Sequence, residues 1–70
     1  MRYAIVLEKT STNYSAYVPD LPGCIATGLT VEEAENEIKA AIAFHIEGLI
    51  EDGLEIPKPV SIVEYLEIAA

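Results

Sequence analysis

The stretch from Thr30 to Gly53 constrains this chain most, because it carries the marks of one long helix with a defined start and end. Thr30 suits the position before a helix, since its hydroxyl can accept a hydrogen bond from the amide of Glu33, three residues on. Gly53, followed by Pro57, provides the usual signals for a helix end. The pattern predicts a helix from Val31 to about Asp52, close to a third of the 70 residues.

The predicted helix is amphipathic. At about 100° per residue, its apolar side chains form one broad stripe that we expect to pack on a sheet. The stripe consists of Val31, Ala34, Ile38, Ala41, Ile42, His45, Ile46 and Leu49. The opposite face carries acidic residues and one aromatic residue: Glu33, Glu37, Phe44, Glu47 and Glu51.

Strand-forming residues fill four other stretches. Tyr3–Glu8 and Tyr14–Val18, separated by a short polar run, predict a β-hairpin. The pair Pro22-Gly23 fits the centre of a type II turn, because proline presets the first φ and glycine accepts the positive second one. Cys24–Thr27 then predicts a third strand and Val60–Ile68 a fourth. The order β-β-β-α-β predicts an α+β fold, with one long helix on one face of a mostly antiparallel sheet.

The small size of the chain predicts a single domain over residues 1–70 that leaves apolar surface uncovered. The sequence is 51% hydrophobic, which is too apolar for a disordered chain despite a net charge of -8. One helix can cover only one face of the sheet, so the other face needs a second partner. We therefore expect a homodimer or a larger homo-oligomer.

The charge balance limits the choice of partners. With 12 acidic against 4 basic side chains, the chain lacks the clustered cations that phosphate contacts need, so we expect no direct nucleic-acid binding. The acidity favours a basic partner protein, or serves only to keep the surface solvated. No run approaches the ~18 apolar residues of a membrane span, and no signal peptide is evident, so a cytoplasmic location is expected.

Cys24 and His45 are the only residues of their kinds, and a nucleophilic pair must be considered. A lone cysteine at the start of a strand is typical of a small buried hydrophobe. The position of His45 in the apolar stripe is typical of a core or interface histidine, and no third group is placed to orient it. We expect no enzymatic activity, no catalytic residue, no metal site and no cofactor.

Three motifs together resemble the HicB-like antitoxin family over nearly the whole chain. They are P-D-L-P-G-C at Pro19–Cys24, T-x-E-E-A at Thr30–Ala34, and E-D-G-x-x-I-P at Glu51–Pro57. The resemblance implies a partial ribonuclease H-like fold and an antitoxin of a type II toxin–antitoxin pair. Its partner would be a HicA-like toxin, a small basic ribonuclease that cleaves mRNA, which the antitoxin binds and occludes.

Many HicB proteins carry a C-terminal DNA-binding domain, whereas this sequence ends at Ala70, after the predicted fourth strand. We therefore expect no such domain here. Two alternatives to the antitoxin stay open: a small metal-dependent nuclease or hydrolase on a ribonuclease H-like scaffold, and a solitary oligomeric scaffold protein.

The candidate residues fall into two groups. Those expected to contact a partner protein are Asp20, Glu33, Glu37, Phe44, Glu47 and Glu51. Those expected to serve the fold, as turn and cap residues, are Pro22, Gly23, Thr30 and Gly53.

Overall fold

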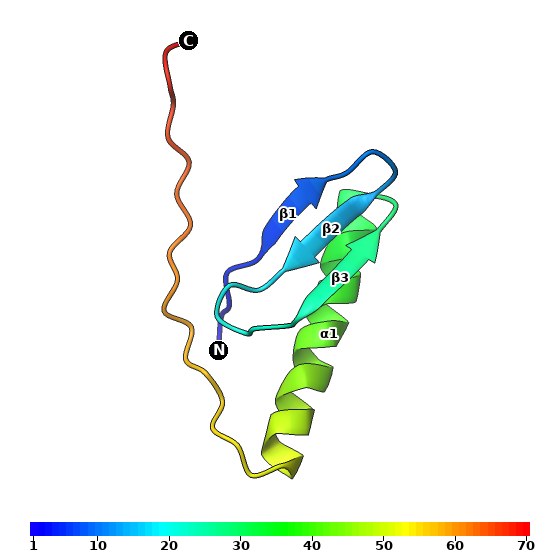
Figure 1. Cartoon of the computed structure of the whole chain (residues 1–70), viewed down its shortest axis with the longest axis vertical. Helices are drawn as coiled ribbons and strands as arrows, with labels where there is room; N and C mark the ends of the chain where they lie inside the picture. The colour runs from blue at the N-terminus through cyan, green and yellow to red at the C-terminus, as the bar shows by residue number, and fades with distance from the viewer.

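Three short strands form one antiparallel sheet, and a long helix follows them in the chain (Figure 1). The computed structural model describes all 70 residues. The strands β1 (Val6–Lys9), β2 (Tyr14–Tyr17) and β3 (Ile25–Gly28) lie in the order β1-β2-β3, and the helix α1 spans Val31–Glu51. The predicted α+β fold is confirmed as three antiparallel strands followed by one long helix.

The strand register separates the residues of the sheet into an inner and an outer face. Leu7, Ala16 and Ala26 are aligned across the three strands and face α1, which packs mainly on β3 and β2. The buried core between sheet and helix consists of Ala16, Val18, Leu21, Cys24, Ala34 and Ile38. The outer face carries a second aligned row, Val6, Tyr17 and Ile25, which no element of the chain covers.

Local hydrogen bonds define both ends of α1. Thr30 is the N-cap, and its Oγ1 accepts a hydrogen bond of 3.1 Å from the amide of Glu33. At the other end, Gly53 has a φ of 67°, a left-handed conformation that glycine adopts without strain. The helix therefore ends within one residue of its predicted boundary at Asp52.

The turn that leads into β3 has the geometry of a type II turn. Gly23 has a φ of 81°, and the amide of Cys24 donates a hydrogen bond of 3.1 Å to the carbonyl of Leu21. The turn directs the chain back along β2, so that Cys24 enters the core.

The predicted fourth strand over Val60–Ile68 is not formed, which corrects that part of the expectation. Residues 54–70, called the tail below, are extended and have no paired neighbour. Tyr3 donates a hydrogen bond of 2.5 Å to the carbonyl of Pro57, and Asp20 accepts from the amide of Ser61 at 3.0 Å. Beyond this anchored root, the tail leads away from the sheet (Figure 1). Its β-forming residues favour an extended backbone, but a strand also needs a hydrogen-bonded neighbour, which this single chain does not place there.

Candidate interaction surface

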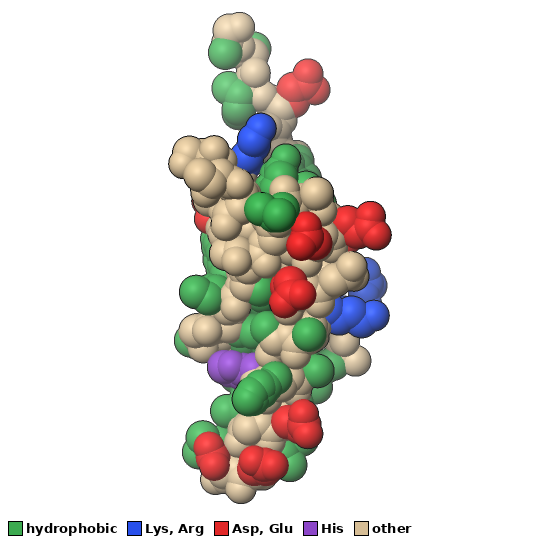
Figure 2. All heavy atoms as spheres, turned by 90° about the vertical axis from the view of Figure 1, so that its right-hand side faces the viewer, with side chains coloured by type: hydrophobic (Ala, Val, Ile, Leu, Met, Phe, Trp, Pro, Cys, Tyr) green, Lys and Arg blue, Asp and Glu red, His purple; other side chains and the backbone are tan.

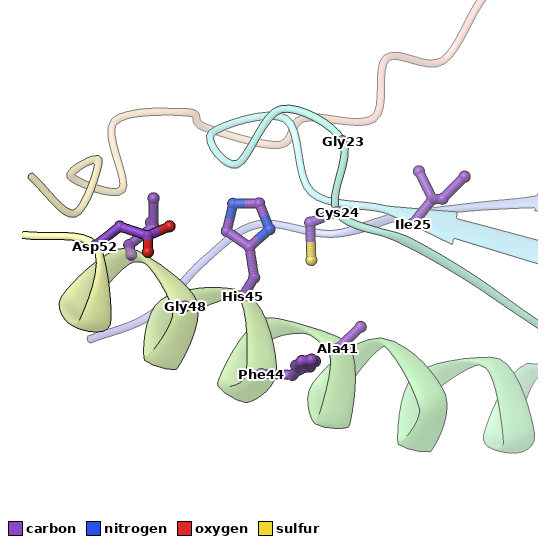
Figure 3. Close-up of a pocket in the computed structure, with 9 residues that line it drawn as sticks. Gly23, Cys24, Ile25, Ala41, Phe44, His45, Gly48 and Asp52 are labelled. Carbon is purple, nitrogen blue, oxygen red and sulfur yellow. The ribbon is translucent and has the colours of Figure 1, made fainter. Parts of the chain in front are cut away.

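A groove of about 430 Å³ lies between α1 and the segment that enters β3 (Figure 3). Three small residues leave this space open: Gly23 on the sheet side, and Ala41 and Gly48 on the helix. Phe44, a large apolar side chain, lies at the groove at 68% exposure, whereas the side chain of Ile25, which borders the groove, points away from α1 (Figure 3). An open hollow with exposed apolar side chains favours contact with another molecule, because burying them removes apolar surface from water.

His45 and Cys24 both line the groove, and the imidazole of His45 points from α1 toward the sheet and the Cys24 side chain (Figure 3). No hydrogen bond joins the two side chains. Burial raises the pKa of the Cys24 thiol, which keeps it protonated near neutral pH. The two side chains form part of the groove lining, and the Cys24 thiol is not activated as a nucleophile.

The outward face of α1 carries a strip of acidic side chains, called the acidic strip below: Glu33, Glu37, Glu47 and Glu51. All four are exposed, and helical spacing places Phe44 among them. Figure 2 shows acidic side chains along this side of the molecule, with hydrophobic side chains between them. The last turn of α1 contains no basic residue, so no helix cation offsets Glu51 at the negative end of the helix dipole.

Five of the six predicted partner residues are thus brought together on one face of α1, and Phe44 joins this face to the groove. Sequence reasoning missed Gly23 and Ile25 as parts of the same surface. They come from another element, and helical periodicity carries no signal for a neighbour contributed by the sheet.

Asp20 has a different environment. Its carboxylate accepts hydrogen bonds from the amides of Val60 at 3.2 Å and Ser61 at 3.0 Å, and from the Ser61 hydroxyl at 2.8 Å. These bonds, the Ser61 amide first among them, hold the pKa of Asp20 below its usual range. The carboxylate therefore attaches the tail to the body of the protein. The contact joins residues 41 apart in sequence, which no local motif could indicate.

Two further features bear on the alternatives. Nowhere in the chain do three His, Cys, Asp or Glu side chains gather in a way that could hold a metal ion. Helix α1 is not apolar enough along its length to cross a membrane.

Comparison with known proteins shows what class of protein this fold belongs to. A family model described as the HicB_like antitoxin of bacterial toxin-antitoxin system matches residues 3–69. A chain of the solved HicA3 and HicB3 toxin-antitoxin complex superimposes with a TM-score of 0.74 at 33% identity, covering 86% of this chain and 70% of that one. The protein belongs to the HicB-like antitoxin family, which confirms the resemblance carried by its motifs, and an antitoxin role is supported.

Relatives of this chain occur in a bacteriophage and in bacteria. A 14.9 kDa protein of Haemophilus phage HP1 is 47% identical over 66 residues, which is 94% of this chain and 50% of the phage protein. A UPF0150 protein of Helicobacter pylori is 40% identical, covering 91% of this chain and 90% of its own length. A UPF0150 protein of Synechocystis is 42% identical over 94% of this chain and 85% of its own length. The chain thus spans half the length of the phage relative and most of the other two.

Proposed function

We propose that this protein is an antitoxin that binds a basic HicA-type ribonuclease toxin through the acidic strip and the adjoining groove. The observation that carries the proposal is the exposed face of α1, where four carboxylates lie along the same side of the helix as Phe44 in a chain of net charge -8. The superposition on a chain of a HicA3 and HicB3 complex supports a toxin partner of the same kind.

Inhibition in this proposal is occlusion of the surface on which the toxin binds RNA. A ribonuclease that binds RNA presents cations to phosphate groups, and the carboxylates of the acidic strip can occupy part of the same positions. The opposite charges speed the encounter and set the orientation, while apolar contacts slow dissociation. Phe44 supplies the apolar part, because it is large, exposed and next to an open hollow.

The direct test is binding to a purified HicA-type toxin, measured by surface plasmon resonance, together with protection of mRNA from cleavage. The variant Glu37→Lys/Glu47→Lys reverses two charges on the acidic strip. We expect its association rate to fall at least about tenfold at low salt, because steering follows the local field. Raising salt should slow association of the unmodified protein toward the variant's rate, since exposed charges are screened beyond ~8 Å at physiological ionic strength.

A matched control separates local charge from net charge. Glu8→Lys/Glu55→Lys makes the same change in net charge at two exposed positions outside α1. The association rate of this control should stay within about twofold of the unmodified protein, because the two substituted sites lie off the docking face. Equal losses in both double variants would show that only net charge matters and would refute the assignment to α1.

A further inference from the structure

Ile62–Ile68, called the tail segment below, is an exposed, extended and mostly apolar part of the tail that pairs with no strand. Most of its residues are hydrophobic, and Tyr65 and Leu66 are 94% and 82% exposed. No backbone or side-chain group in this segment forms a hydrogen bond within the chain. An extended, β-forming stretch with free amides and carbonyls is a template for pairing with another strand.

The root of this segment is fixed, which aims the segment away from its own sheet. Asp20 accepts three hydrogen bonds from Val60 and Ser61, and Tyr3 holds the carbonyl of Pro57. After Ser61 the chain runs past the sheet on the β1 side, opposite to α1 (Figure 1). A segment held at its base and free beyond it is placed to reach a second molecule.

The matching acceptor is the open edge at β1. Strand β1 pairs only with β2, so its other edge offers unpaired backbone groups. Ile5 and Leu7 are only partly buried there, because α1 packs mainly on β3 and β2. Apolar side chains of an added strand would complete the cover over these two residues.

Charge and length also fit this pairing. Two of the four basic residues of the chain, Arg2 and Lys9, lie at the two ends of the stretch around β1. The tail segment carries two acidic residues, Glu64 and Glu67. The tail segment is as long as Tyr3–Lys9, and each spans roughly 23 Å when extended. A chain of net charge -8 repels its own copies, so this local complementarity matters for self-association.

We propose that two copies of this chain exchange their tail segments, each Ile62–Ile68 adding a strand to the β1 edge of the other copy. Donor and acceptor belong to the same chain, so a two-fold symmetric dimer satisfies both at once. The exchange covers an open edge strand and two apolar tail segments in one step. It identifies the missing fourth strand as one that forms only between molecules.

The test begins with the mass of the full chain by light scattering at micromolar concentration. We expect about 15 kDa, twice the 7.6 kDa of one chain. Leu66→Asp should raise the dimer dissociation constant at least about 100-fold, because each dimer buries two Leu66 side chains. The control Ala69→Asp adds the same charge outside the segment and should leave the dissociation constant nearly unchanged. A monomeric unmodified chain, or a dimer indifferent to Leu66→Asp, would overturn the proposal.

A second measurement locates the contact in the unmodified protein and does not depend on any variant folding. In a mixture of isotope-labelled and unlabelled chains, isotope-filtered NMR should detect intermolecular contacts between Ile62–Ile68 and Tyr3–Leu7. Contacts of the tail segment with its own β1, or with any other surface, would refute the exchange. So would a tail that pairs only after a toxin is added.

Discussion

Gly28 is the point of closest approach between the sheet and the start of α1, and replacing it should destabilise the fold sharply. A Cβ at Gly28 would lie 2.8 Å from both the carbonyl carbon and the Cβ of Glu33, and closer still to the amide nitrogen of Ala34. That amide forms the first hydrogen bond of α1, to the carbonyl of Thr30 at 3.0 Å, and Ala34 itself is fully buried. Because the Ala34 amide is hydrogen-bonded and its residue is buried, these backbone atoms cannot shift without moving the start of α1.

Relief in Gly28→Ala therefore requires α1 and β3 to separate. Restoring ordinary contacts of 3.4 Å takes a shift of at least about 0.6 Å from the two Glu33 atoms at 2.8 Å, and a larger shift from the Ala34 amide nitrogen, across the main packing contact of the molecule. Overpacking of this kind costs up to about 3 kcal/mol. Replacing glycine also restricts the unfolded chain, which stabilises the folded state by about 0.5–1 kcal/mol. We therefore expect a net loss of about 2 kcal/mol in the free energy of unfolding.

Gly48→Ala is the matched control, because it makes the same chemical change where the added Cβ would have no atom within 4 Å other than the backbone of its own helix and its chain neighbours. Gly48 is inside α1, and alanine is favoured over glycine in a helix interior by about 0.5–1 kcal/mol. The two substitutions should therefore shift stability in opposite directions.

Urea unfolding followed by circular dichroism measures both variants. Protein concentration must be equal in all samples, since self-association makes stability depend on it. With a slope near 1 kcal/mol per molar urea, the midpoint of Gly28→Ala should fall by about 2 M and that of Gly48→Ala should rise by about 0.5–1 M. An unchanged midpoint for Gly28→Ala, or shifts of equal sign, would show that the two backbones separate easily and would refute the reasoning.

Three further predictions concern single groups. Thr30→Ala should lower the free energy of unfolding by about 1 kcal/mol, because the first turn loses its side-chain acceptor, whereas Thr27→Ala on the outer sheet face should change it by less than about 0.5 kcal/mol. Hydrogen bonds from Ser61 lower the pKa of Asp20 from its ordinary value of 3.8. The root of the tail should therefore stay attached at pH values above 3.8 and detach as the pH falls through the lowered pKa of Asp20. NMR amide shifts of Ser61 should follow this transition in the unmodified chain and lose it in Asp20→Asn. Cys24 should react slowly with iodoacetamide at pH 8 in the folded protein and rapidly in urea, because burial raises its pKa; equal rates would contradict this.

Features that depend on near neighbours in sequence were predictable here. Thr30 and Gly53 mark the ends of the helix because cap and stop signals act within a few residues, and the predicted helix differs from the observed one by a single residue at its C-terminus. Pro22 and Gly23 likewise determine a turn that is complete within four residues. The acidic strip follows from helical spacing alone.

Features that depend on distant contacts were not predictable from these patterns. Val60–Ile68 has the composition of a strand, but whether it becomes one depends on a neighbouring edge that sequence periodicity cannot supply. The groove beside Phe44 depends on Gly23 and Ile25 from another element, and the role of Asp20 depends on a residue 41 positions away. In each case the residue type indicated what interaction the side chain or backbone can make, but not which distant residue it contacts.

The arrangement of the fold separates the two surfaces that the proposals require. The acidic strip and groove belong to α1 and the start of β3, whereas the tail leaves on the β1 side of the sheet (Figure 1). Binding of a toxin and exchange of tails therefore use different atoms, and each can fail without the other. Leu66→Asp should yield a monomer that still binds one toxin molecule, and Glu37→Lys/Glu47→Lys should remain a dimer with weakened toxin binding. If either variant lost both properties while remaining folded, the two surfaces would have to be coupled through the thin core between them, and a two-sided description of this molecule would be wrong.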